Sequence, residues 1–147
     1  MFKHILIPTD GSALSRKALK RGLALARKLK TKVTAVYVFT PIAMTMYGEI
    51  GPGWETVEKH MREFARREGK KHLDRAEAIA KSSGVKIQRI LIEDSPVWKG
   101  IIDTARMKRC DAIFMGAHGR GALTTLLLGS QTNAVLAHSK LPVLVYR

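Results

Sequence analysis

The chain has 147 residues, 46% of them apolar, and a formal net charge of +14. This length and composition favour one globular domain over residues 1–147 and exclude a disordered chain. No apolar run approaches the roughly 20 residues that cross a bilayer, and the N-terminus enters a strand-like run without signal-peptide anatomy. Because Cys110 is the only cysteine, no intrachain disulfide can form, and we expect a soluble cytoplasmic protein.

The basic charge is uneven, since no Asp or Glu occurs between Asp10 and Glu49. A field of this sign attracts nucleic acid, acidic membrane surfaces or phosphates. The alternative is a solvated helix face, which is what most charge runs are. The sequence has none of the aromatic stacking motifs of RNA-binding modules, so a nucleic-acid-binding module is the less favoured hypothesis.

Short apolar runs alternate with helical patterns along the chain. The runs predict strands over residues 2–8, 33–39, 85–92, 111–117 and 141–146. Helices are predicted after an N-cap at Ser12, over roughly 55–83 with Gly84 ending it, after an N-cap at Ser95, and over 130–138. The segment 40–54, rich in Gly, Pro and Met, is predicted as a loop or partial helix that packs or covers a site.

Five alternations of strand and helix predict an α/β fold with a five-stranded parallel sheet and helices on both faces, as in Rossmann-like domains. Ligands of such sheets bind beyond the carboxyl ends of the strands, where the strand order reverses. The first and fourth predicted strands end in the most polar, glycine-containing turns. We therefore expect the site between these two turns.

The fourth strand is followed by glycines in the spacing G-x2-G-x9-G-S, formed by Gly116, Gly119, Gly129 and Ser130. Glycine lets a ligand approach the main chain closely. The start of the last helix offers unpaired N–H groups and a favourable dipole to an anion. The Ser130 hydroxyl could cap that helix or donate to a phosphate oxygen. The pattern indicates a phosphate site, and plain turn residues are the alternative.

Two better-known phosphate motifs are absent. The chain has no G-x4-G-K-S/T, so no lysine is positioned as in P-loop NTPases. It also has no G-x-G-x-x-G after the first strand, which disfavours an ordinary dinucleotide fold.

The runs 115–121, 127–130 and 141–145, together with the opening 5–12, resemble the universal stress protein family over essentially the whole chain. The glycine spacing is similar to that of the ATP-binding branch of the family. The resemblance implies a five-stranded parallel domain, of the adenine nucleotide alpha hydrolase type, that binds ATP. It also implies a homodimer through the last strand, Leu141–Tyr146, which would otherwise be an apolar edge.

The resemblance also implies which residues would contact the nucleoside. Asp10 resembles the ribose-contacting aspartate of the family, and Pro8 and Thr9 line the same pocket. A carboxylate can accept hydrogen bonds from both ribose hydroxyls, although Asp10 could instead be only a turn residue before Gly11. Val38 resembles the residue whose main chain meets adenine, and its assignment rests on the resemblance.

The remaining contacts fall on the second half of the chain. Met115 and Gly116 would close over the nucleoside, and Gly119, Gly129 and Ser130 would take the phosphates. Gln131 would add a main-chain donor. The family often has a small aliphatic residue or Ser at this position, so the role of the Gln131 side chain stays open.

Two further residues, His118 and Arg120, lie within the glycine-rich stretch and have open roles. Arg120 could neutralise phosphate charge or face solvent, and His118 is more readily a packing residue than a catalytic one. A Mg²⁺ ion could arrive with the phosphates, since no His, Cys and Asp cluster has metal-ligand spacing.

The implied function is that of an ATP-dependent regulator or sensor. A slow ATPase or autophosphorylating enzyme is the alternative, with no general base or motif lysine to support efficient catalysis.

Overall fold

The computed structural model describes residues 1–40, 51–118 and 128–147. Its strands are β1 (His4–Pro8), β2 (Lys32–Phe39), β3 (Ile87–Glu93), β4 (Ala112–Gly116) and β5 (Val143–Tyr146). Its helices are α1 (Ala13–Leu29), α2 (Trp54–Ser82), α3 (Val97–Met107) and α4 (Ser130–His138). Within these ranges the predicted alternation of strands and helices is confirmed.

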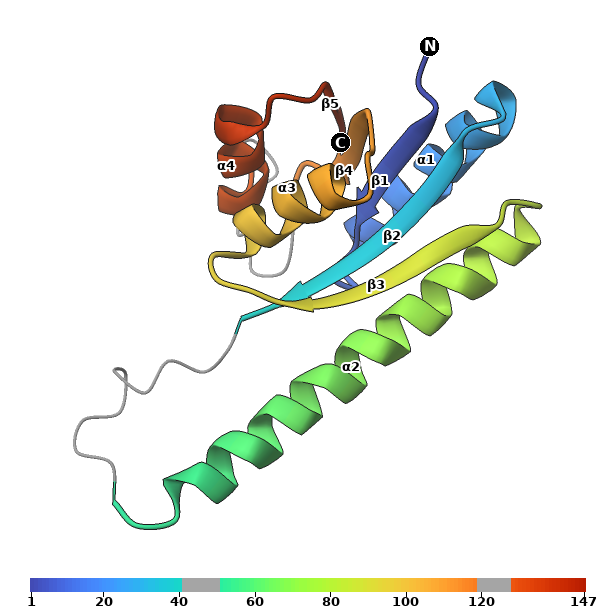
Figure 1. The fold of residues 1–147 in the computed structure, drawn as a ribbon. Coiled ribbons are helices and arrows are strands. Elements are labelled where there is room, and N and C mark those ends of the chain that lie inside the picture. Colours follow the sequence, from blue (N-terminus) through green and yellow to red (C-terminus); the bar gives the residue numbers. More distant parts are fainter. Residues whose placement is uncertain (41–50, 119–127) are drawn as a thin grey trace.

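The strands form a five-stranded parallel sheet in the order β3-β2-β1-β4-β5 (Figure 1). Alternate side chains of a strand point to opposite faces, so each face has its own core. Ile5 and Ile7 of β1 pack with residues of α1 and α2, whereas Leu6 packs with residues of α3 and α4. Two helices therefore cover each face, and the predicted fold class is confirmed.

The structure confirms one predicted helix cap and corrects another. Ser12 caps α1 as predicted, with its hydroxyl accepting the Ser15 N–H at 3.1 Å. The predicted N-cap at Ser95 is wrong: α3 begins after Pro96, and the Ser95 N–H donates to Asp94 Oδ1 at 2.7 Å. Pro96 has extended backbone, so the helix starts one residue later than the sequence pattern indicates.

Helix α2 is much longer than the sheet is wide. Its 29 residues extend about 43 Å at 1.5 Å per residue, and only its C-terminal half carries buried residues. Figure 1 shows the N-terminal half projecting beyond the strands. The apolar side chains of Val57, Met61 and Phe64 are accordingly exposed. The fully buried contacts of the long helix with the sheet thus begin at Gly69.

The single cysteine lies inside the core under α3. Cys110 is buried among the residues packed around Leu6 and Ile113, and burial raises the pKa of its thiol from 9.0 to about 11. The nearby Asp111 carboxylate acts in the same direction. The thiol is therefore protonated at neutral pH and weakly nucleophilic, as expected for a small packing residue.

The raised pKa predicts a pH-dependent contribution of Cys110 to stability. The unfolded thiol ionises near its ordinary value while the folded thiol stays protonated, so stability is fully present below pH 9 and falls as pH rises toward 11. Urea denaturation of the wild type and Cys110→Ala between pH 7 and pH 11 measures this. The wild type should lose more stability than the variant over the upper window, and equal losses would contradict the prediction.

Candidate functional site

The sheet reverses its strand order between β1 and β4. From β1 the chain first builds outward through β2 and β3, and then returns to add β4 and β5 on the other side. The connections that leave the carboxyl ends of β1 and β4 consequently run to opposite faces. This leaves a crevice between them, where open α/β sheets bind ligands.

A cavity of about 460 Å³ lies at this crevice. Nine of the eleven residues predicted for the site line it: Pro8, Thr9, Asp10, Val38, Met115, Gly116, Gly129, Ser130 and Gln131. The other two, Gly119 and Arg120, lie outside the described residues. Residues from the ends of three strands and the start of one helix are thus brought to one cavity.

The turn after β1 forms the polar side of the cavity. The Thr9 N–H donates to the Val36 carbonyl at 2.9 Å, which holds the turn against β2. One oxygen of Asp10 accepts the Ser12 N–H at 2.9 Å. This bond orients the carboxylate beside the cavity. Asp10 is therefore both the turn residue and a candidate ligand-binding residue.

The opposite wall of the cavity is apolar and comes from β2 and α3. Val38 lies on β2, and Val97 and Ile101 of α3 line the same space. A Cβ added at Gly100 would lie 2.8 Å from Val38 Cγ1, so the absence of a side chain at this position allows α3 to lie directly on the strand. The role of Val97 and Ile101 in the cavity is not evident from the sequence, because nothing in their spacing shows that α3 begins at the cavity.

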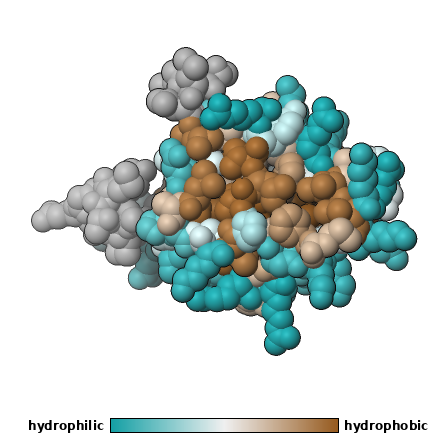
Figure 2. Space-filling view, turned by 90° about the horizontal axis from the view of Figure 1, so that it is seen from above, coloured by the Kyte–Doolittle hydropathy of each residue, from teal (hydrophilic) through white to brown (hydrophobic). Residues whose placement is uncertain are grey.

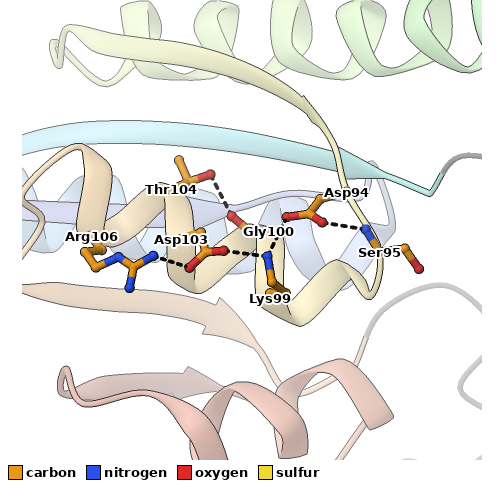
Figure 3. Close-up of polar contacts among 7 residues, drawn as sticks. All are labelled: Asp94, Ser95, Lys99, Gly100, Asp103, Thr104 and Arg106. Atoms are coloured by element: carbon orange, nitrogen blue, oxygen red, sulfur yellow. Dashed lines mark hydrogen bonds and ion pairs between the residues drawn. The ribbon is translucent and has the colours of Figure 1, made fainter.

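Surface ion pairs brace the outer side of α3 (Figure 3). Lys99 Nζ lies 2.8 Å from Asp103 and 3.6 Å from Asp94, and Arg106 lies 2.9 Å from Asp103. The hydrogen bond from Lys99 lowers the pKa of Asp103. Exposed pairs of this kind contribute little to stability. The position of the apolar wall therefore depends on the packing of α3 against the sheet, which includes the contact between Gly100 and Val38, more than on these ion pairs.

The phosphate end of the predicted site is the N-terminus of α4. Gly129 is the N-cap residue and makes no side-chain cap; its N–H donates to the Ala117 carbonyl at 2.7 Å. The Ser130 hydroxyl is thus not the helix cap, because Ser130 is already the first helical residue. No acidic residue lies in the first turn. The first N–H groups of the helix can therefore bind an anion.

Buried Thr132 ties this helix start to the sheet. Its hydroxyl donates to the Gly116 carbonyl at 3.0 Å, so the last residue of β4 and the first turn of α4 are held together. The sequence analysis did not identify Thr132 or Ser15, which also line the cavity. The Thr132 hydroxyl bonds to a residue 16 positions earlier, and the Ser15 hydroxyl donates to the Ser12 carbonyl at 3.1 Å, and neither bond is implied by the glycine motif.

The Gln131 side chain has a structural role that the sequence left open. Its Oε1 accepts the main-chain N–H of Trp98 at 2.9 Å and so joins the starts of α3 and α4. The rings of Trp98 and His138 stack with centroids 4.4 Å apart and join the same two helices. The apolar wall and the anion-binding helix start are thereby fixed relative to each other.

His118 lines the cavity, and its Nδ1 is buried with no hydrogen-bond partner among the described residues. The described residues hold no group of three or more His, Cys, Asp or Glu arranged for a metal ion. Among the described residues that line the cavity, Asp10 is the one carboxylate and there is no lysine or arginine. The chemistry offered is hydrogen bonding to a polar ligand and an anion, beside an apolar wall.

Comparison with known proteins gives a consistent family match. The sequence model of the universal stress protein family matches residues 1–147. Universal stress protein MJ0531 of Methanocaldococcus jannaschii is 33% identical over the whole of this chain and 83% of its own length. No helix in the described part of the chain is long and apolar enough to cross a membrane.

Solved structures repeat the fold. UspA from Lactobacillus plantarum superposes with a TM-score of 0.84 at 23% identity, covering 99% of this chain and 97% of its own. A universal stress protein in complex with cAMP gives a TM-score of 0.71 at 21% identity, covering 99% of this chain and 97% of its own. One from Archaeoglobus fulgidus in complex with dAMP gives 0.66 at 18%, covering 100% and 98%. At these identities the likeness concerns the fold.

The bond from Thr132 to Gly116 predicts that the helix start depends on one buried hydroxyl. Thr132→Val keeps the side-chain shape but leaves the Gly116 carbonyl without that donor, which costs about 1–3 kcal/mol of unfolding free energy. Urea denaturation measures the loss, with the exposed Thr56→Val as the control, expected within about 0.5 kcal/mol of wild type. Equal stabilities of the two variants would show that the bond does not hold α4.

Proposed function

Because the chain belongs to the universal stress protein family, we propose that its cavity binds ATP and that the protein is a nucleotide-dependent regulator in a stress response. In this proposal the bound nucleotide sets a conformation that a partner protein recognises. The observation that carries it is the meeting of Asp10, an apolar wall and the N-terminus of α4 in one cavity.

The two sides of the cavity suit the two ends of a nucleotide. A purine base would lie against Val38, Val97 and Ile101, where an apolar surface excludes water from its faces. Asp10 would accept hydrogen bonds from the ribose hydroxyls. Pro8, Thr9 and Met115 would enclose the nucleoside between the ends of β1 and β4. The cAMP and dAMP complexes of structural neighbours support an adenine nucleotide as the ligand class.

The phosphates would lie at the start of α4. Main-chain N–H groups of Ser130 and Gln131 and the helix dipole favour an anion there, and Gly129 permits its close approach. Gly119 and Arg120 would complete the phosphate end of the site, while Gly116 would close over the nucleoside with Met115. A Mg²⁺ ion would enter with the nucleotide, held by the phosphates and water.

Binding without rapid turnover is the function that the residues support best. Phosphoryl transfer needs cations on the transferred group and a residue that orients the nucleophile. The described cavity residues supply neither a lysine nor an arginine, and Asp10 is assigned to the ribose. Slow hydrolysis or autophosphorylation is the alternative, and an assay of phosphate release with Mg²⁺ separates it from binding alone.

Replacing the Asp10 carboxylate tests the ribose contact. Asp10→Asn keeps an oxygen that can accept the Ser12 N–H, so the turn is preserved, but it replaces a charged acceptor with a neutral amide. We expect calorimetric titration to show ATP binding weakened about tenfold or more. Parallel titrations with ADP and AMP measure the phosphate preference.

The matched control is Glu63→Gln, which makes the same change on exposed α2. It should leave the affinity for ATP unchanged. If Asp10→Asn binds ATP as tightly as Glu63→Gln does, the assignment of Asp10 to the ribose is wrong.

We also propose that the chain forms a homodimer through its last strand. β5 is at one edge of the sheet, and its residues are only half-buried. Figure 2 views the molecule from the side on which Figure 1 draws β5 and the C-terminus, and a band of hydrophobic residues crosses this face. Pairing of two such edges would cover the apolar surface and the unpaired main chain together.

The outward main-chain groups of β5 belong to alternate residues. The carbonyls of Pro142 and Tyr146 accept N–H groups from the β4 side, so by alternation Val143 and Val145 direct theirs to the open edge. Val145→Pro removes one outward donor and should shift the protein from dimer to monomer in analytical ultracentrifugation. Val145→Thr keeps the donor and should remain dimeric. Equal dimer affinities of the two variants would contradict pairing through this edge.

A further inference from the structure

A second groove, of about 660 Å³, lies between α2 and β3, on the sheet edge opposite β5. Leu73, Ile87 and Leu91 contribute its apolar surface. The residues that line it are all different from those of the nucleotide cavity. Any ligand of this groove is therefore independent of the function proposed above.

Ion pairs show how the helix and the strand are aligned. Arg62 of α2 lies 2.9 Å from Glu93 at the end of β3, and Arg89 pairs with Asp74 and, at 3.3 Å, with Glu77. Earlier residues of α2 thus face later residues of β3, and Figure 1 shows the two elements running alongside each other. The helix and strand are antiparallel along the groove.

Three basic residues lie on α2 between Arg62 and Asp74, the helix residues that form these ion pairs. Arg66, Arg67 and Lys70 line the groove, are exposed, and form no ion pair with a described residue. The helix backbone beside them lies close to β3, because a Cβ at the neighbouring Gly69 would be 2.6 Å from Leu91 Cδ1. Glu77 is the one carboxylate that lines the groove, and Arg89 already neutralises it. This part of the groove is strongly positive.

The β3 edge offers main-chain hydrogen bonds beside these cations. β3 pairs with β2 on one side, and no described strand pairs with its other side. The Asp94 N–H donates to the Phe39 carbonyl of β2, so by alternation the main chains of Arg89, Leu91 and Glu93 point to the open side. The edge could accept an added strand at the position of the basic residues.

We propose that this groove binds an extended acidic segment of a partner protein, which adds a strand to β3. Arg66 and Lys70 are four residues apart on a helix, a rise of about 6 Å, and alternate residues of a strand are about 6.6 Å apart. Acidic side chains at every second position of an added strand would therefore meet the two cations in turn. Charged residues on an edge strand also prevent uncontrolled pairing, so the segment needs complementary charge to bind.

The first test uses the unmodified protein and two fluorescein-labelled peptides. One is a ten-residue peptide of alternating Glu and Val, and the other has the same sequence with every residue N-methylated, which removes the main-chain donors on both sides of the added strand. Fluorescence anisotropy should show the first peptide binding about tenfold more tightly than the second. Equal affinities would overturn strand addition.

The second test places the peptide in the groove. Arg66→Glu with Lys70→Glu should weaken binding of the Glu-Val peptide about tenfold. The control, Lys17→Glu with Lys20→Glu on exposed positions of α1, changes the net charge by the same amount and should have less than a threefold effect. Circular dichroism verifies that both variants are folded.

Two results would overturn the proposal in this experiment. Equal weakening by the two double variants would mean that only the net charge attracts the peptide. Displacement of the peptide by oligothymidylate of equal charge, at equal concentration and with the same sensitivity to Arg66→Glu and Lys70→Glu, would mean that the groove is a nucleic-acid site instead.

Discussion

The reversal of strand order between β1 and β4 is the constraint on which the rest of the site depends. Parallel strands bring all their carboxyl ends to one edge of the sheet, but most of that edge is covered by connections that run to the same face. At the reversal the two connections diverge, and a space opens that side chains from both directions can line. Asp10 and the glycine motif are far apart in sequence, and this crossover is what brings them together.

The two helices on one face of the sheet contribute different surfaces to that space. α3 lies directly on β2 at Gly100 and presents apolar side chains, while α4 presents its N-terminus. The Gln131 side chain and the Trp98–His138 stack join the two helices. A shift of either helix would therefore alter both walls, which gives a physical route by which an occupied cavity could change the outer surface of α3 and α4.

The parts predictable from sequence are those set by local pattern. Strict alternation of short apolar runs and helices was sufficient for the fold class, and the glycine spacing located the start of α4 at Ser130. The roles of Val97 and Thr132 in the cavity were not predictable, because they depend on which helix end the topology brings to the crevice. The N-cap assignment at Ser95 failed for a related reason, since Pro96 and Asp94 together delay the helix by one residue.

The structure also changes which basic residues are the best candidates for binding an acidic partner. In the sequence, the acid-free stretch between Asp10 and Glu49 is the candidate for attracting polyanions, with a solvated helix face as the alternative. In the fold, Arg66, Arg67 and Lys70 of α2 are the ones that line a groove with apolar residues and an open strand edge. The sequence does not predict this groove, because the strand edge beside these residues comes from the sheet order.

Mass spectrometry of the gently purified protein under native conditions tests the central claim most directly. With ATP added, we expect the wild type to carry one adenine nucleotide per chain and Gly129→Val to carry none, because the valine side chain would block the approach of the phosphates to the start of α4. A wild type that binds no adenine nucleotide, or a Gly129→Val variant that binds ATP equally well, would contradict the account.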